Sequence, residues 1–185
     1  MSRPGLSPFT ARLGKQWTRG PAPGMVRLMI VPAEGDFRLD DATATAQLGA
    51  ALARELRPGE ALCLSGPLGA GKSVLARGAI RALTTPDEEA PSPTFTLAQF
   101  YEGDGLDLTH FDLYRLADAE EAFEVGLDEA LEQGAVIIEW PERLDPHRPA
   151  DRLDIEIAID ETGEARHARL TPHGAWEGRG IEFGA

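Results

Sequence analysis

The chain of 185 residues is 42% hydrophobic and 26% charged, proportions that are ordinary for one folded globular domain. Its net charge of −13 at neutral pH argues against broad, sequence-independent binding to nucleic acid, which requires a basic surface. No apolar run approaches the roughly 20 residues of a membrane span, and the single cysteine excludes an internal disulfide, so we expect a cytoplasmic protein.

The beginning of the chain differs in composition from the rest. Residues 1–32 are rich in proline and glycine and contain basic residues but no acidic one. A basic, acid-free start is typical of a transit peptide, but these prolines would interrupt its amphipathic helix. We expect a disordered extension over 1–32, in which Met25 is an alternative start, a folded domain over 33–172, and a loose tail over 173–185.

Hydrophobic spacing predicts the elements of the first half of the domain. A helix capped by Asp40 or Asp41 is expected to run to about Leu56, because leucines recur along it at helical spacing. The apolar run 61–64 predicts a buried strand in which Cys63 is a core residue rather than a nucleophile. The other elements expected here are a strand at 37–39, a helix at 72–83 and a polar loop at 85–93.

The second half is predicted to contain mainly strands. A turn-like start at 92–93 leads into a strand that ends near 101, and a hairpin turn at 102–105 joins it to an antiparallel strand at 106–115. The remaining elements expected are short helices from 118 and at 127–132, a buried strand at 135–140, and strands at 152–159 and 165–171. This order predicts an α/β fold, a single three-layer P-loop NTPase domain with a mixed parallel and antiparallel sheet.

The clearest motif is GPLGAGKS at 66–73, between a predicted strand and a predicted helix, which matches the phosphate-binding pattern G-x-x-x-x-G-K-[ST]. Glycines allow the backbone N–H groups to surround a phosphate, and the helix N-terminus favours an anion. Lys72 would reach the terminal phosphates, and the Ser73 hydroxyl would bind Mg²⁺. The alternative is a glycine-rich turn before an ordinary surface lysine, but the chain has lysine only at 15 and 72. We therefore predict an ATP and Mg²⁺ site formed by Gly66, Leu68, Gly69, Ala70, Gly71, Lys72, Ser73 and Val74.

Two acidic residues are candidates for the chemistry. Asp112 lies within a predicted strand, and Glu139 ends a buried one, at the edge where α/β sheets bind ligands. With Ser73, one of them would hold Mg²⁺, and the other could orient water or sense the terminal phosphate. We therefore predict Lys72, Asp112 and Glu139 as catalytic and Ser73, Glu139 and Asp112 as metal ligands. The alternative is that each acid pairs with an arginine, such as Arg115 or Arg143.

Four further residues have two interpretations each. Thr94 and Thr96 would share one side of an extended strand, where they could contact the terminal phosphate, or they could simply reflect the preference of threonine for strands. We include Thr94 among the nucleotide-binding candidates. His110 is interpreted as structural or exposed rather than catalytic. Trp140 either anchors the core or covers the site.

Four stretches, in this order, resemble the TsaE (YjeE) family, the bacterial ATPase of tRNA threonylcarbamoyladenosine synthesis: GPLGAGKS at 66–73, SPTFTL at 92–97, HFDLYRL at 110–116 and IEWPE at 138–142. The resemblance covers about residues 36–160. It implies weak ATPase activity in support of modification at tRNA position 37, together with the threonylcarbamoyl transferase subunit and its inactive paralogue. It also implies that Thr94 lies in a switch-like loop, that Asp112 is essential and that Glu139 binds Mg²⁺ with Ser73. Pro67 and Ser73 depart from the family, which commonly has Asp and Thr at these places.

Two rival functions remain open. A small-molecule kinase of the same fold would need an acceptor pocket and usually an arginine-rich lid, and no compact arginine cluster follows the P-loop helix. A nucleotide-gated assembly module would bind the nucleotide, and its hydrolysis would be incidental.

Overall fold

The computed structural model describes residues 29–183, so residues 1–28 of the extension predicted over 1–32 lie outside the described residues. Its elements, in chain order, are β1 (Met29–Pro32), β2 (Gly35–Leu39), α1 (Ala42–Glu55), β3 (Ala61–Ser65), α2 (Lys72–Leu83), β4 (Ala98–Tyr101), β5 (Leu108–Asp112), α3 (Glu120–Glu124), α4 (Leu127–Gln133), β6 (Ala135–Glu139), the 3₁₀ helix η2 (Pro141–Leu144), β7 (Arg152–Ile159), β8 (Arg166–His173), the 3₁₀ helix η3 (Gly174–Trp176) and β9 (Gly180–Phe183). No helix of this described part is long and apolar enough to cross a membrane.

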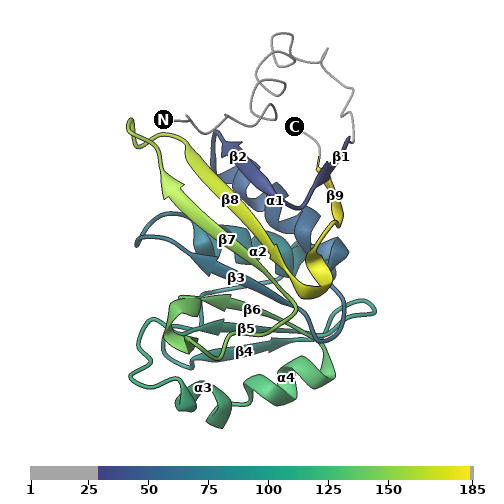
Figure 1. Cartoon of the computed structure of the whole chain (residues 1–185), viewed down its shortest axis with the longest axis vertical. Coiled ribbons are helices and arrows are strands. Elements are labelled where there is room, and N and C mark those ends of the chain that lie inside the picture. Colours follow the sequence, from purple (N-terminus) through teal and green to yellow (C-terminus); the bar gives the residue numbers. More distant parts are fainter. Residues whose placement is uncertain (1–28, 184–185) are drawn as a thin grey trace, which may run out of the picture.

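One large sheet runs through the molecule in the order β2-β8-β7-β3-β6-β5-β4 (Figure 1). The four central strands β7, β3, β6 and β5 are parallel, whereas β2, β8 and β4 are added in antiparallel pairs. The carboxyl ends of β3, β6 and β5 therefore meet at one edge of the sheet. The predicted α/β fold with a mixed sheet is confirmed.

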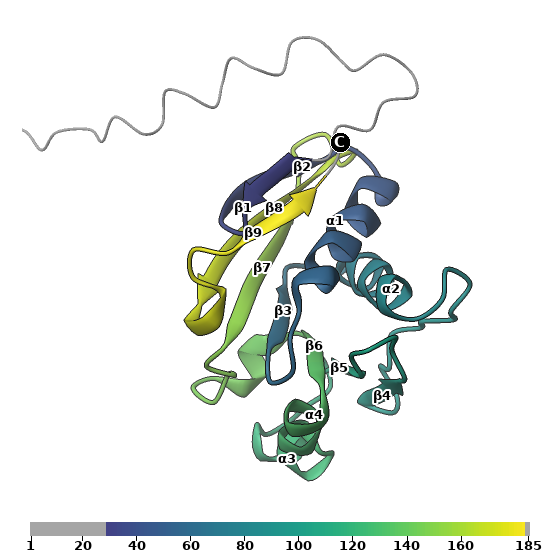
Figure 2. The same ribbon diagram turned by 90° about the vertical axis from the view of Figure 1, so that its right-hand side faces the viewer.

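The sheet is covered on both faces, as three layers require. Along β3, Leu62 and Leu64 join the core beneath α1 and α2, while Ala61 and Cys63 join a second core with residues of α3, α4 and η2. Figure 2 shows α1 and α2 side by side on one side of β3. All four of these β3 side chains are fully buried, which explains why the strand reads as a continuous apolar run.

Helix α1 packs unusually close to α2, the helix that begins at the predicted phosphate loop. A Cβ atom on Gly49 would lie 2.1 Å from the Leu75 carbonyl oxygen, and one on Gly78 would lie 2.1 Å from that of Ala46. The Asp41 carboxylate caps α1 by accepting a hydrogen bond from Ala44 N at 2.8 Å. The glycines thus allow backbone contact that fixes α2 against the core.

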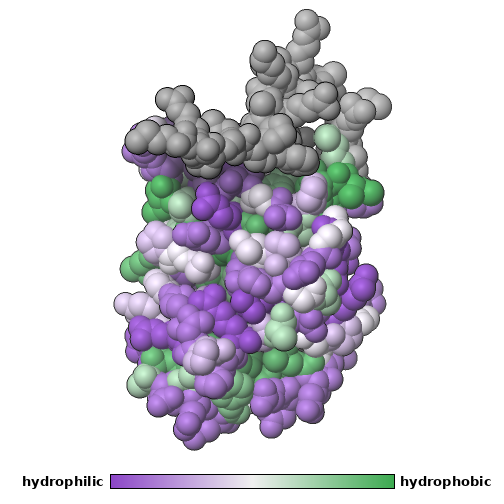
Figure 3. All heavy atoms as spheres, viewed as in Figure 1, coloured by the Kyte–Doolittle hydropathy of each residue, from purple (hydrophilic) through white to green (hydrophobic). Residues whose placement is uncertain are grey.

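At β7 one face of the sheet is open to solvent. Leu153, Ile155 and Ile157 of β7 are buried, and the intervening Asp154 and Glu156 point to the other side. Hydrophilic residues predominate over this face in Figure 3. The strand predicted at 152–159 is confirmed, but its buried side ends at Ile157, because Ile159 at the end of β7 is 40% exposed.

The strand predicted to end near 101 is shorter than expected, and this prediction is wrong for its first half. Only Ala98–Tyr101 forms β4, and residues 94–96 form a turn. Leu97 has a left-handed backbone with φ of 64°, and its N–H donates to the Pro93 carbonyl at 2.7 Å. The turn separates Thr94 and Thr96, so these two side chains do not share one side of a strand.

Both ends of the described chain are ordered, which corrects the boundaries expected at 32 and 173. Met29–Pro32 and Gly180–Phe183 pair as an antiparallel two-stranded sheet, β1 with β9. Between β8 and β9, Trp176 is 0% exposed. Burial of this large aromatic side chain explains the order, because it removes much apolar surface from water.

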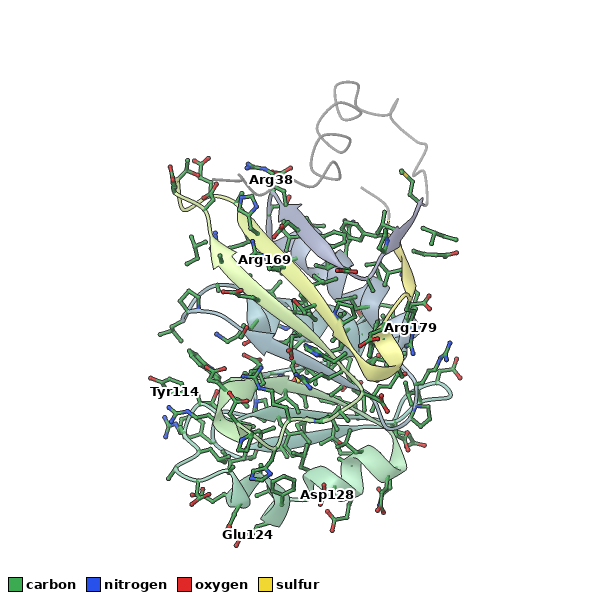
Figure 4. All side chains as sticks on the ribbon, viewed as in Figure 1. Arg38, Tyr114, Glu124, Asp128, Arg169 and Arg179 are labelled. Carbon is green, nitrogen blue, oxygen red and sulfur yellow. The ribbon has the colours of Figure 1, made fainter. Side chains whose placement is uncertain are left out.

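An ion pair holds this C-terminal segment to the start of β3. The Arg179 guanidinium donates to both carboxylate oxygens of Glu60, at 2.6 and 2.8 Å, and the two side chains are 10% and 5% exposed. These hydrogen bonds raise the pKa of Arg179 further. Glu60 precedes β3, at the end opposite to the phosphate loop, and Figure 4 shows Arg179 and Tyr114 on opposite sides of the molecule.

We expect Arg179→Ala to destabilise the protein by about 3 kcal/mol, because it leaves the buried Glu60 carboxylate without its partner. In a thermal melt this corresponds to a Tm that is lower by about 6–12 °C. The matched control is Arg169→Ala, which removes an exposed pair with Asp36 at 2.9 Å and should leave Tm nearly unchanged. Equal Tm values for the two variants would contradict the structural role of Arg179.

The core position predicted for Cys63 is confirmed, since its side chain is fully buried. Burial, reinforced by the charge of Asp154, raises the pKa of the Cys63 thiol to about 12. Because only the thiolate reacts, we expect native protein at pH 8 to react with iodoacetamide on the order of 10³-fold more slowly than an ordinary cysteine. Mass spectrometry of the native and guanidinium-unfolded protein measures this difference, and rapid labelling of the native protein would contradict it.

Candidate functional site

The loop after β3 has the backbone of a phosphate cradle. Gly66, Gly69 and Gly71 all have positive φ, of 133°, 78° and 109°. At Gly66 a side chain is also excluded by space, because a Cβ atom would lie 2.2 Å from the Ile157 carbonyl oxygen. Helix α2 follows with no side-chain cap at its N-terminus. Its first N–H groups are therefore available to an anion.

Lys72 is folded back into this loop. Its ammonium donates to the carbonyl oxygens of Gly66 at 2.6 Å and Pro67 at 3.0 Å, and it lies 3.8 Å from the centre of the Trp140 ring. Burial lowers the pKa of Lys72, and the charges of Glu139, Glu142 and Asp112 oppose this change. The carbonyls and the aromatic face thus hold a cation beside the cradle.

Trp140 lines the site and also packs against the second core, so each of its two interpretations describes part of its role. It follows β6 in a left-handed conformation with φ of 62°, and its ring packs 5.0 Å from that of Tyr114. Pro141 comes next and begins η2. The turn at Trp140 therefore directs the ring back over the loop rather than along the strand.

Glu139 joins the loop from the end of β6. Its Oε2 accepts a hydrogen bond from the Ser73 hydroxyl at 3.1 Å, and its Oε1 lies 3.0 Å from His110 Nε2. A hydroxyl and a carboxylate are hard oxygen donors of the kind that Mg²⁺ takes, and Mg²⁺ commonly completes its shell with water and phosphate oxygens. In residues 29–183 no group of three or more His, Cys, Asp or Glu could hold a metal alone. Ser73 and Glu139 fit a cation that arrives with a phosphate.

Asp112 ends β5 directly beside Glu139, with which it is in register. Its Oδ2 accepts hydrogen bonds from the hydroxyls of Ser92 at 2.5 Å and Thr94 at 2.8 Å, and its Oδ1 accepts one from Tyr114 N at 3.1 Å. Within the described chain neither acid forms an ion pair with an arginine, so the arginine-pairing alternative is wrong. Both carboxylates instead face the loop.

These elements enclose a pocket of about 380 Å³ at the carboxyl edge of the sheet. Most of the predicted site residues line it: Leu68, Gly69, Gly71, Lys72, Ser73, Val74, Thr94, Asp112 and Glu139. Gly66 and the buried Ala70 belong to the same loop but do not line the pocket. Leu68 lines it and is 81% exposed. Thr96 is exposed and does not line the pocket.

Sequence reasoning missed three residues of the site, one of which is Tyr114, which lines the pocket and donates its N–H to Asp112. Ser92 was assigned only to a turn, and His110 only to a structural or exposed position, yet both contact the carboxylates. A signal for His110 exists, because residues two apart on a strand share a face and His110 precedes Asp112 by two. No such signal points to Ser92, whose position depends on how the loop after α2 folds.

A pocket of about 470 Å³ lies elsewhere, beside β1 and β9. It is somewhat larger, but its lining residues from Ile30 to Glu34 and from Gly178 to Gly180 offer one cationic group, Arg179, which is already paired with Glu60. Among the two pockets, only the one at the phosphate loop combines a lysine, hydroxyls and carboxylates. The chemistry therefore points to that pocket despite its smaller volume.

Comparison with known proteins gives matches over most of the chain. The family model described as "Threonylcarbamoyl adenosine biosynthesis protein TsaE" matches residues 39–168. The chain is 38% identical over 129 residues to the tRNA threonylcarbamoyladenosine biosynthesis protein TsaE of Rickettsia conorii, covering 70% of this chain and 74% of that protein. It is 37% identical over 139 residues to the protein of that name from a Nostoc species, covering 72% and 83%. The crystal structure of YdiB from Bacillus subtilis superposes with a TM-score of 0.63 at 28% identity, covering 81% of this chain and 88% of that one.

Proposed function

The chain belongs to the TsaE family, and from this we propose that it binds MgATP and slowly hydrolyses it in support of tRNA N6-threonylcarbamoyladenosine biosynthesis. The observation that carries the proposal is the convergence of Lys72, Ser73, Asp112 and Glu139 around one glycine-rich loop. A P-loop fold binds nucleotides, and these four side chains supply the charges that phosphoryl chemistry requires.

Each side chain has a task that follows from its position. The loop N–H groups and the N-terminus of α2 bind the phosphates, and the Lys72 ammonium exchanges its two loop carbonyls for the terminal phosphate oxygens. Ser73 and Glu139 hold the Mg²⁺ ion, which when bound neutralises charge on the phosphates. The Trp140 ring covers the lysine and reduces the access of water to it.

Asp112 is assigned to the attacking water. Its carboxylate is held at both oxygens, by Ser92 and Thr94 on one side and by Tyr114 N on the other, so its orientation is fixed before any ligand enters. A fixed anion that lines the pocket can accept a hydrogen bond from water and align it with the phosphate. Thr94 leaves Asp112 when it contacts the phosphate, which makes its loop responsive to the nucleotide.

We further infer that the chain acts with the threonylcarbamoyl transferase subunit and its inactive paralogue, and that it reaches tRNA only through them. The net charge of −13 supports an indirect contact with tRNA, because an acidic surface repels phosphates. Slow hydrolysis in the isolated chain fits a site whose lysine is bound to loop carbonyls and whose Thr94 is bound to Asp112.

Phosphate release from MgATP tests this function, measured for the chain alone and with both partners and tRNA. We expect slow release alone and faster release in the complex. Binding without release in either state would favour the assembly module, and absence of binding would overturn the nucleotide site. Phosphorylation of a small hydroxyl acceptor would identify a kinase, although among residues 29–183 no arginine lines the pocket to form a lid.

A further inference from the structure

One buried polar residue beside the site has no part in the function proposed above. His110 lies in the middle of β5 and is 1% exposed. Its Nε2 is 3.0 Å from Glu139 Oε1, and the Glu139 side chain is itself only 4% exposed. A polar contact in such a dry environment is stronger than one at the surface and is costly to leave incomplete.

The register of β5 and β6 explains why these two side chains meet. Asp112 pairs with Glu139, and His110, two residues earlier on the same face, pairs with Ile137. His110 therefore approaches Glu139 from inside the sheet, whereas Ser73 approaches it from the phosphate loop. The carboxylate is held between them, with Oε1 on His110 and Oε2 on Ser73.

The other ring nitrogen of His110 indicates which one carries the proton. Nδ1 is buried and has no hydrogen-bond partner within the described residues 29–183. A carboxylate oxygen can only accept, so the nitrogen that faces Glu139 must donate. The tautomer with hydrogen on Nε2 satisfies this requirement. It also leaves a lone pair at the unpartnered Nδ1, which costs less than leaving an N–H there without an acceptor.

We propose that His110 is a positioning residue for Glu139: its Nε2–H fixes Oε1, so that Oε2 is turned toward Ser73 and the divalent cation. This inference rests on the proposed function, in which Glu139 and Ser73 hold Mg²⁺. The terminal torsion of a glutamate has a broad energy minimum, so without a second contact the carboxylate would rotate away from its productive orientation. Such outer contacts typically change metal affinity by about 10- to 100-fold.

Two substitutions separate positioning from simple core packing. The amide nitrogen of glutamine reaches the place of histidine Nε2, whereas that of asparagine reaches only the place of Nδ1. We expect His110→Asn to raise the Mg²⁺ concentration at half-maximal binding of a fluorescent, non-hydrolysable ATP analogue by about 10- to 100-fold. We expect His110→Gln to stay close to wild type, and His167→Asn, at an exposed histidine of β8, to have no effect.

Binding of the same analogue in EDTA provides the second readout, and it should be equal in all variants. If His110→Asn retains the wild-type Mg²⁺ midpoint, or if glutamine and asparagine act alike, the positioning role is overturned. If the wild-type protein binds the analogue with no dependence on Mg²⁺, the proposed MgATP function fails instead. The two failures are therefore distinguishable.

A measurement on the wild-type protein does not depend on the folding of any variant. Nitrogen-15 NMR of the histidine rings distinguishes the two neutral tautomers, and correlation of the ring signals with the assigned backbone resonances of the wild-type protein identifies His110. We expect the Nε2–H tautomer at His110. The Nδ1–H tautomer would place a lone pair against the Glu139 carboxylate and would overturn the proposal.

Discussion

Asp112→Asn should abolish most ATP hydrolysis, by a factor on the order of 10²–10⁴, while MgATP still binds. The substitution preserves the shape of the side chain. The asparagine oxygen still accepts from Tyr114 N, and its NH₂ group can donate to the hydroxyl oxygens of Ser92 and Thr94. Only the negative charge that aligns the water is lost. Single-turnover phosphate release, together with analogue binding, measures both effects.

Asp104→Asn is the matched control for this charge change, because Asp104 is an exposed residue in the turn between β4 and β5. Its hydrolysis should equal that of wild type. If Asp112→Asn hydrolyses ATP normally, Asp112 does not orient the water and Glu139 becomes the remaining acid. If it stops hydrolysis but still supports tRNA modification with the partners, the assembly module replaces the coupled ATPase.

Lys72→Ala should weaken MgATP binding by about 2–5 kcal/mol, which corresponds to about 30- to 4000-fold in Kd. Lys72 is the one lysine of the described residues, and it lines the pocket at the phosphate loop. Lys72→Arg should not restore binding, since the enclosure formed by two carbonyls and the Trp140 ring fits a compact ammonium better than a planar guanidinium. Isothermal titration of the ATP analogue measures both variants.

The control is Arg81→Ala, which removes a cation from the last turn of the same helix and should leave Kd unchanged. Normal binding by Lys72→Ala would remove the lysine from the site. The pH dependence provides a further check on the wild type. Because burial lowers the pKa of Lys72, and only its charged form attracts phosphate, affinity should begin to fall at a lower pH than for an ordinary lysine as pH rises.

Local patterns predicted most of the fold because they depend on neighbouring residues. The spacing of leucines and the Asp41 cap located α1, and the apolar run at β3 followed by the glycine motif predicted a helix at 72–83, where α2 lies. A glycine-rich loop that must bend back on itself needs positive φ, which its own sequence specifies. For this reason the predicted phosphate loop and the order of elements agree with the structure.

Local sequence patterns could not predict the hydrogen bonds that orient the Asp112 and Glu139 carboxylates. Ser92 and Thr94 meet Asp112 across about 20 positions of chain, and His110 meets Glu139 across 29. The same limit explains the errors at the ends, where Arg179 finds Glu60 across 119 positions and β1 pairs with β9. By itself the sequence determined which residues could bind phosphate and which segments would be helices or strands, because these properties follow from the residue types and their local spacing. The tertiary structure alone decided how each carboxylate is oriented at the pocket, because that depends on hydrogen-bond partners brought together only by folding.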